Sequence, residues 1–272
     1  MNRLRIKHST GFHYGGDVTA SYNEARMLPV SADGQLVLYS HVEILPISSQ
    51  HNYVDYWGSR VSSFEILTPH KELSLTATSL VEVRPRVHTS EKLSWDALTA
   101  LAETATSYIE QTKQTRRTDP PDDVIAIARE IAGRSVSPCD AALEICTVIG
   151  DAVEYMQGVT GVTSTAKEAW AVRKGVCQDI THLALGALRS VGIPARYVSG
   201  YLHPSRMPRS ARPSPVNRTR GSSGSAESGA ASTRRTSSTS ATGTSPSAAA
   251  ATTTMCPRCA VCTRARTAAP CS

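Results

Sequence analysis

The chain has 272 residues, with 29 Lys and Arg against 23 Asp and Glu, and a formal net charge of +6. The charge is unevenly placed, because residues 205–272 hold ten Arg and a single acid, Glu227, which gives this segment +9 and leaves −3 for residues 1–204. The same segment has no Ile, Leu, Phe, Tyr or Trp. It cannot bury enough apolar surface to offset its chain entropy, so we expect a disordered tail at 205–272 and a folded body before it.

The start of the chain predicts neither export nor membrane insertion. Residues 1–5 are followed by alternating polar residues rather than an apolar leader, and no run of about 18 apolar residues occurs anywhere. Three of the seven cysteines, Cys139, Cys146 and Cys177, lie in the body. We therefore expect a cytoplasmic protein with reduced body thiols and no membrane partner.

Residues 1–86 predict an antiparallel β-domain, because polar and apolar residues alternate with a period of two. The clearest runs are residues 3–7, 35–39, 72–76 and 81–83, with Gly and Pro between them.

The period then changes to three and four residues, which is typical of amphipathic helices. Apolar residues over 95–109 predict one such helix. Two more helices are predicted, one over 122–133 after a Pro-Pro pair and one from 138 towards 155.

A short helix is predicted over residues 165–174. Thr165 and Glu168 match a capping box at its start, and Gly175 is expected as its C-cap. Residues 195–202 alternate again, which predicts a strand.

Cys177 stands at the first turn of the last predicted helix, which is apolar through Val191 and ends at Gly192 and Pro194. Unpaired N–H groups and the positive dipole end at a helix start favour a thiolate, the nucleophilic form of cysteine. A buried, unreactive cysteine gives the same pattern. The residues alone leave both interpretations of Cys177 open.

The string around this cysteine resembles a known family. Residues 174–183 read KGVCQDITHL and residues 188–201 read LRSVGIPARYVSGY, which is similar to the core of bacterial transglutaminase-like proteins of the papain-like cysteine superfamily. Residues 22–29, YNEARMLP, and 55–58, DYWG, resemble the N-terminal domain that accompanies that core.

The resemblance implies an α+β fold in three parts. These are an antiparallel β-domain at 1–86, a truncated transglutaminase-like, papain-like core at 90–204, and the tail at 205–272. It assigns no oligomeric state.

In this family the cysteine attacks an amide to form a thioester, a His on a following strand is the base, and an Asp on the next strand orients that His. Water or an amine then resolves the thioester. The resemblance therefore implies that Cys177 is the catalytic nucleophile and that its own amide contributes to an oxyanion hole. It also implies a protein or peptide substrate, attacked at side-chain or backbone amides, and no metal or organic cofactor.

The catalytic His and Asp cannot be carried over, because the family pattern ends after Pro204 and no His follows. His182 is five residues from Cys177, about 140° around a helix, so we expect it to pack in the core. His203 is expected in a loop and Asp179 at the helix start as a dipole partner. The chain as written is expected to be an inactive enzyme; the alternative is a non-catalytic remnant or protein-binding module.

The tail has three interpretations. Cys256, Cys259, Cys262 and Cys271 have spacing similar to that of metal ligands, but no apolar packing surrounds them, so no metal site is expected. Its arginines would suit phosphates, but Lys and stacking aromatics are missing, so no nucleic-acid partner is expected.

The third interpretation is a reading-frame shift in a GC-rich gene. Residues 215–223, with codons CCG GTG AAT CGC ACG CGT GGG TCG AGN, read from the third base as Gly-Glu-Ser-His-Ala-Trp-Val-Glu, which is similar to the family's string around the catalytic His. In the same frame, residues 231–236 can conceal Ile-Asp-Pro-Thr-Asn, similar to the string around the catalytic Asp, and residues 205–211 and 251–258 also conceal family strings. This hypothesis explains the composition of the tail without assigning it a function.

Overall fold

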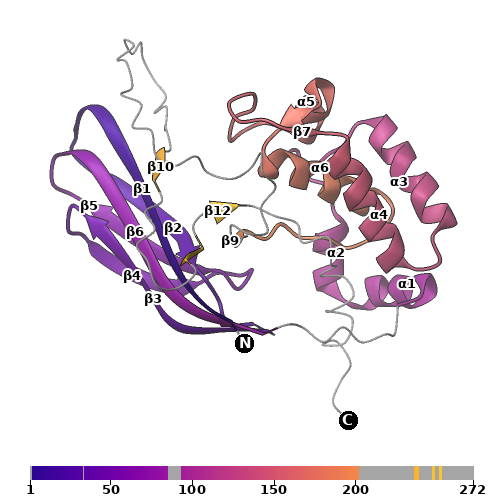
Figure 1. Ribbon diagram of the computed structural model, residues 1–272, viewed down its shortest axis with the longest axis horizontal. Coiled ribbons are helices and arrows are strands. Elements are labelled where there is room, and N and C mark those ends of the chain that lie inside the picture. The colour runs from indigo at the N-terminus through magenta and orange to yellow at the C-terminus, as the bar shows by residue number, and fades with distance from the viewer. Residues whose placement is uncertain are drawn as a thin grey trace. The chain divides into compact units, whose positions relative to one another are not determined.

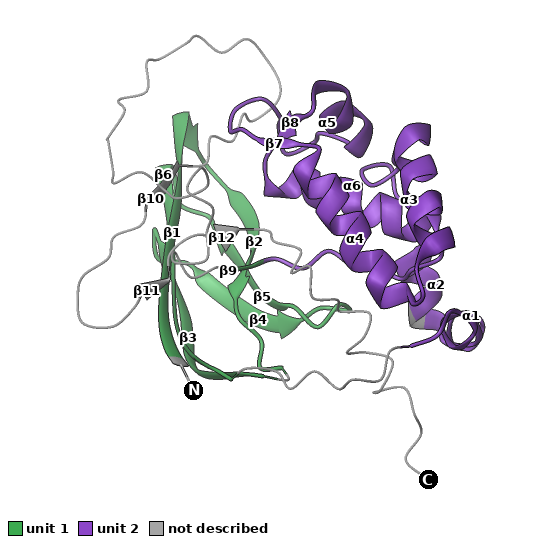
Figure 2. Ribbon diagram, turned by 45° about the vertical axis from the view of Figure 1, so that its right-hand side comes forward, with its two compact units in different colours: residues 1–87, 200–251 green, residues 88–199, 252–272 purple. Residues whose placement is uncertain are grey.

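The computed structural model describes residues 2–32, 34–84 and 93–201, and three short later strands (Figure 1). The chain divides into two compact units, residues 1–87 with 200–251 and residues 88–199 with 252–272 (Figure 2). The later strands are β10 (Thr236–Ser238), β11 (Ser247–Ala248) and β12 (Ala251–Thr252). The rest of the tail, and with it the predicted disorder, lies outside the described residues, as does His203.

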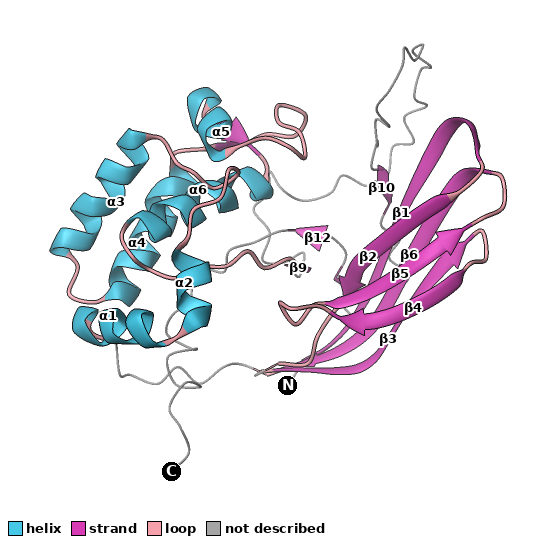
Figure 3. Cartoon of the chain, turned by 180° about the vertical axis from the view of Figure 1, so that it is seen from behind, coloured by secondary structure: helices cyan, strands magenta, loops and turns pink. Residues whose placement is uncertain are grey.

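The six strands between residues 2 and 83 of the first unit pair antiparallel (Figure 3), which confirms the predicted β-domain. In one sheet β6 lies between β1 and β3, and in the other β5 lies between β2 and β4. The strands are β1 (Asn2–Val18), β2 (Ser21–Leu28), β3 (Gln35–Leu45), β4 (Ser49–Val54), β5 (Arg60–Ile66) and β6 (His70–Val83).

One apolar cluster draws side chains from both sheets, so the sheets pack face to face in this unit. Its buried members alternate along each strand, as the period-two pattern requires. They are Ala25, Val42, Ile44, Phe64, Ile66, Leu73, Leu75 and Ala77.

The second unit is helical, with two strands of two residues each. Its elements are α1 (Trp95–Thr104), α2 (Thr106–Thr112), α3 (Asp122–Arg134), α4 (Pro138–Asp151), β7 (Glu154–Tyr155), α5 (Ala166–Val172), β8 (Lys174–Gly175) and α6 (Cys177–Ser190). Helix α6 is central, because α2, α3, α4 and α5 all pack against it. Every residue of α6 from 181 to 188 is buried.

Two predicted helices differ from the structure. The helix expected over 95–109 is two helices, because Ala105 is extended (φ −108°, ψ 111°) and caps α1 by donating its N–H to Leu101 O. The helix expected to run from Pro138 towards residue 155 ends at Asp151.

The short helix α5 has the predicted capping box of Thr165 and Glu168, but its end was predicted wrongly. The left-handed residue is Arg173 (φ 53°), not Gly175. The guanidinium of Arg173 lies 3.3 Å from the centre of the Trp170 ring, a cation–π contact that favours this conformation.

The strand predicted over 195–202 is confirmed only at Gly200–Tyr201 (β9): residues 195–199 form no ladder, and residue 202 lies outside the described residues. The backbone of Ala195 is occupied elsewhere: its N–H donates to Gln111 O at 3.0 Å, and its carbonyl accepts from Arg189 at 2.8 Å. A residue bonded in this way cannot also pair with a neighbouring strand.

The expectation of three reduced body thiols is wrong for Cys139, which is disulfide-bonded. Cys146 and Cys177, among the described cysteines, form no disulfide. A disulfide depends on which cysteines the fold brings together, and spacing in the sequence does not show this. No helix in the described part of the chain has the length and apolar character needed to span a membrane.

Candidate active site around Cys177

Cys177 is the first residue of α6, as predicted, and two neighbouring elements hold it there. The parallel pair of β7 and β8 is tied by Glu154 N–H to Arg173 O at 2.9 Å and by Met156 N–H to Gly175 O at 2.8 Å. Val176 follows in extended conformation as the N-cap. The helix therefore starts at a point fixed by backbone hydrogen bonds on its N-terminal side.

The side chain of Asp179 accepts the backbone N–H of Val176, the residue before this helix. Its Oδ2 accepts the N–H of Val176 at 2.8 Å and the hydroxyl of Thr160 at 2.6 Å. Its side chain is 1% exposed, and its charge lies in the first turn, where the helix dipole favours an anion. The prediction that Asp179 is a helix-start group is confirmed.

Gly175 is required by this arrangement for reasons of space. A Cβ on Gly175 would lie 2.8 Å from both Cβ and Oδ2 of Asp179. Glycine lets the backbone of β8 lie directly against the buried carboxylate.

Cys177 is half-buried in the first turn of α6, where the helix dipole favours an anion. Its carbonyl accepts the hydroxyl of Thr181 at 2.7 Å. The loop before α5 lies against the same turn, because Gln178 donates its side-chain amide to Val162 O at 3.2 Å. The arrangement suits an attacking thiolate and an amide donor for a developing oxyanion.

His182 does not complete this site. It is 6% exposed, and it lines a cavity together with Gln178, Leu185 and Arg189, a set that does not include Cys177. Burial lowers the pKa of His182 below its ordinary value, so the ring is neutral near pH 7. The other histidines in the described ranges all belong to the first unit, so the described second unit brings no imidazole to Cys177.

No three His, Cys, Asp or Glu side chains gather in a possible metal site anywhere in the described ranges. The tail cysteines lie outside those ranges.

With this geometry in place, comparison with known proteins identifies the family. Residues 4–82 match the family described as Bacterial transglutaminase-like N-terminal region, and residues 125–228 match the Transglutaminase-like superfamily. An uncharacterized protein of Mycobacterium leprae is 39% identical over 206 residues, which cover 76% of this chain and 73% of that protein. The chain belongs to the transglutaminase-like superfamily.

Other relatives of this transglutaminase-like chain are more distant. An uncharacterized protein of Mycobacterium tuberculosis H37Rv is 29% identical over 211 residues, which cover 74% of this chain and 66% of the relative. A crystal structure of a candidate cysteine protease from Cytophaga hutchinsonii matches with a TM-score of 0.58 at 20% identity, covering 76% of this chain and 70% of that one. The predicted α+β fold, with its N-terminal antiparallel β-domain and papain-like core, is thereby confirmed.

Two residues that hold the Cys177 turn were missed from the sequence, Thr160 and Val162. Both lie in the loop between β7 and α5 and reach the helix only because the β7–β8 pair closes that loop. No pattern in the sequence marks such contacts, since they depend on the path of the loop.

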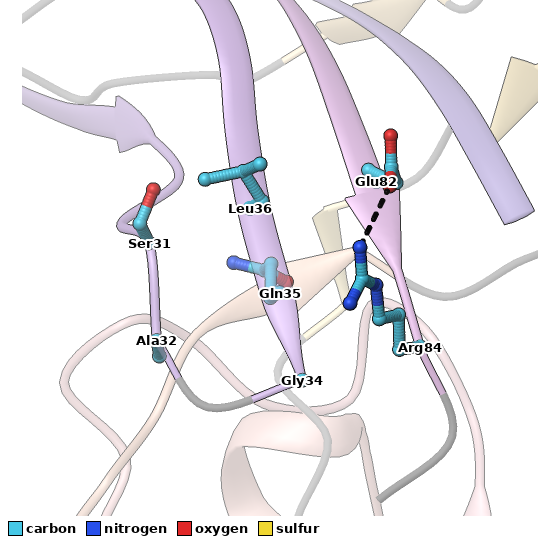
Figure 4. A pocket seen from close by; sticks show the side chains of 7 residues that line it. All are labelled: Ser31, Ala32, Gly34, Gln35, Leu36, Glu82 and Arg84. Atoms are coloured by element: carbon cyan, nitrogen blue, oxygen red, sulfur yellow. Dashed lines mark ion pairs between the residues drawn. The ribbon is translucent and has the colours of Figure 1, made fainter. Parts of the chain in front are cut away.

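A second cavity, of about 480 Å³, lies in the β-domain at the ends of β3 and β6. Figure 4 shows Arg84 directed at Glu82, at 3.7 Å, and Arg3 approaches the same carboxylate at 3.3 Å. The Glu82 side chain is 5% exposed. Its charge is neutralised by arginines within the chain, which indicates a structural ion-pair cluster rather than a reactive site.

Proposed function

We propose that this chain derives from a cysteine enzyme that acts on amide bonds and that Cys177 is its nucleophile. The observation that carries the proposal is the place of Cys177 as the half-buried first residue of the central helix. Superfamily membership supports the same role.

The proposed reaction starts with attack of the Cys177 thiolate on an amide carbon. The carbonyl becomes an oxyanion, which the N–H of Cys177 at the helix start stabilises. As the C–N bond breaks, the leaving amine takes a proton and a thioester remains on Cys177. Water or a second amine then attacks the thioester, which releases an acid or a new amide and restores the thiol. The substrate is a protein or peptide that presents side-chain or backbone amides.

The chain as written is proposed to be inactive, because the described part of the second unit brings no imidazole to Cys177 for these proton transfers. His182 is neutral and lines a cavity apart from Cys177, and no His follows His203. The shifted reading frame supplies both missing groups in family order, which supports a frameshift after Pro204.

The test is to restore the frame by inserting or deleting a single base after Pro204. The restored chain is expected to be alkylated faster at neutral pH than the written chain and to release ammonia or cleave an amide. The control is Cys177→Ser in the restored chain, which keeps the size of the side chain but replaces the thiolate by a much weaker nucleophile. Equal activity with Ser at this position would refute the assignment of the nucleophile.

A second candidate function is a protein-binding module with an inert Cys177. It is favoured by β4, an edge strand whose residues are all exposed, and by exposed aromatic side chains in the same unit: Tyr22, Tyr56 and Trp57 are 73%, 75% and 52% exposed. Exposed edges and aromatic side chains are typical of binding surfaces. This function predicts slow alkylation and no amide turnover in the restored chain as well.

A further inference from the structure

A cavity of about 370 Å³ lies in the helical unit along one face of α6. Gln178, His182, Leu185 and Arg189 line it at three- and four-residue spacing, which places them on one side of the helix. The facing wall includes Arg117. Its volume is within the range of small-molecule sites, about 300–1,000 Å³.

One side chain in this cavity has an unmet hydrogen-bonding group. His182 is 6% exposed, and its Nδ1 has no hydrogen-bond partner. Its ring lies against Tyr197, with ring centres 5.7 Å apart. The ring is hydrogen-bonded to the Ser164 backbone, so the one proton of the neutral ring lies on the other nitrogen, and the buried Nδ1 is left without a partner, which is costly. A carboxylate beside Nδ1 would favour the protonated ring, whose Nδ1–H it accepts.

The cavity also has an uncompensated positive charge. Arg189 donates to Ala195 O, Lys113 O and the Thr118 hydroxyl, all of which are neutral acceptors. Burial lowers the pKa of Arg189, and no carboxylate in the described ranges forms an ion pair with it. The guanidinium of Arg189 is half-buried and paired with no carboxylate, so its charge adds to the attraction of the cavity for an anion.

Two further features strengthen the positive field. Arg117 lines the cavity with an exposed side chain that forms no ion pair within the described ranges, and its charge acts on His182. Arg116 and Lys113 lie in the same segment. The acid that acts on His182 is Asp179, whose Oδ2 is bonded to Val176 and Thr160 and whose buried Oδ1 has no hydrogen-bond partner.

We propose that this cavity binds a small organic carboxylate, held by the guanidinium of Arg117 and by Nδ1 of His182, which takes up a proton from solvent as the carboxylate binds. A carboxylate matches the planar fork of arginine. The apolar part of the ligand lies on Leu185 and the Tyr197 ring, which favours an organic acid over inorganic phosphate. This site is separate from the chemistry of Cys177 and does not depend on the proposed function.

Isothermal titration of the full chain with benzoate tests the proposal, with benzamide as a neutral ligand of the same shape. Benzoate is expected to bind saturably with a Kd of about 1 mM, and benzamide is expected to show no saturation up to about 10 mM. Arg117→Gln is expected to weaken benzoate by about tenfold, the effect of one charge-assisted contact. Arg116→Gln is the matched control, because it removes the same charge from an adjacent exposed residue, and it is expected to weaken binding by less than about twofold.

Several outcomes would overturn the proposal. They are equal binding of benzoate and benzamide, equal losses in the two arginine variants, or inorganic phosphate binding more tightly than benzoate. Arg117→Lys, which keeps the charge without the fork, is expected to retain part of the affinity. In NMR titrations benzoate is expected to raise the pKa of His182, and an unchanged pKa at saturation would contradict contact with its ring. Benzoate against benzamide on the unmodified chain decides the case even if a variant does not fold.

Discussion

Gly175→Ala tests whether the Cys177 helix start depends on close contact between β8 and Asp179. The added Cβ would lie 2.8 Å from Cβ and Oδ2 of Asp179, whereas ordinary contact begins at 3.4 Å. The new methyl group and the Asp179 side chain must therefore move apart by about 0.6 Å, the difference between 3.4 and 2.8 Å. Asp179 is 1% exposed and cannot turn into solvent.

The expected cost is about 2–4 kcal/mol of unfolding free energy. Overpacking in a buried site costs about 1–3 kcal/mol. Moving Asp179 also weakens its hydrogen bonds with Val176 and Thr160, and a bond to a charged group contributes about 1.5–3 kcal/mol. Urea denaturation followed by helical circular dichroism measures the loss, because all described helices belong to the second unit.

Two comparisons separate steric contact from a general effect of alanine. Gly161→Ala adds the same methyl group where no atom lies within 4 Å, so it is expected to change stability by less than about 1 kcal/mol. In an Asp179→Gly background both 2.8 Å contacts of the new methyl, with Cβ and with the carboxylate, are gone, so Gly175→Ala is expected to cost less there. Strict additivity of Gly175→Ala and Asp179→Gly would refute the reasoning.

Four further predictions follow from the packing, the pKa values and the composition. Gly186→Ala forces a methyl group against the backbone at Thr118 and should lower the unfolding free energy by about 2 kcal/mol or more. Gly150→Ala adds a methyl group in open space on α4 and should raise the unfolding free energy by about 0.5–1 kcal/mol. Urea denaturation measures both. Burial lowers the pKa of His182 below 6.5, so its contribution to stability is present above pH 6.5 and is lost as the pH falls through the pKa of the folded state. In thermal melts, the melting temperature of His182→Gln should therefore fall less in acid than that of the unmodified chain. Burial raises the pKa of Tyr201 from 10.0 to about 12, so its contribution is present below pH 10.0 and is lost as the pH rises towards 12, and Tyr201→Phe should lose less stability over that interval. Limited trypsin digestion, followed on a gel, should remove residues 205–272 before it cuts the body, and a protected tail fragment would contradict the composition argument.

The β-domain could be predicted from alternation, but its strands could not all be located. The four runs identified in the sequence lie in β1, β3 and β6. Strand β4, SQHNYV, was missed because all of its residues are exposed and no alternation of burial is imposed on them. Alternation marks a strand only where one face is buried.

Local signals were enough to place Cys177, because the capping box of α5, the glycine of β8 and the apolar run of α6 are all close to it in the chain. Non-local contacts account for the error at residues 195–199. The backbone N–H of Ala195 donates to Gln111 O and its carbonyl accepts from Arg189, and neither hydrogen bond can be inferred from the alternation of residues 195–202. The cavity proposed to bind a carboxylate could not be predicted for the same reason. Arg117 is far from α6 in the sequence, and only the fold places it beside that helix.

The β7–β8 pair has a consequence for how this family varies. It brings the two ends of residues 156–173 together, so that this segment leaves and re-enters the helical unit at one place. Lengthening the loop that precedes α5 in this segment costs little, about 0.6 kcal/mol for each doubling of its length. Insertions that keep the contacts of Thr160 and Val162 leave the β8 connection to Cys177 unchanged while they reshape the surface of this loop. Relatives can therefore diverge in this loop and keep the same turn at Cys177.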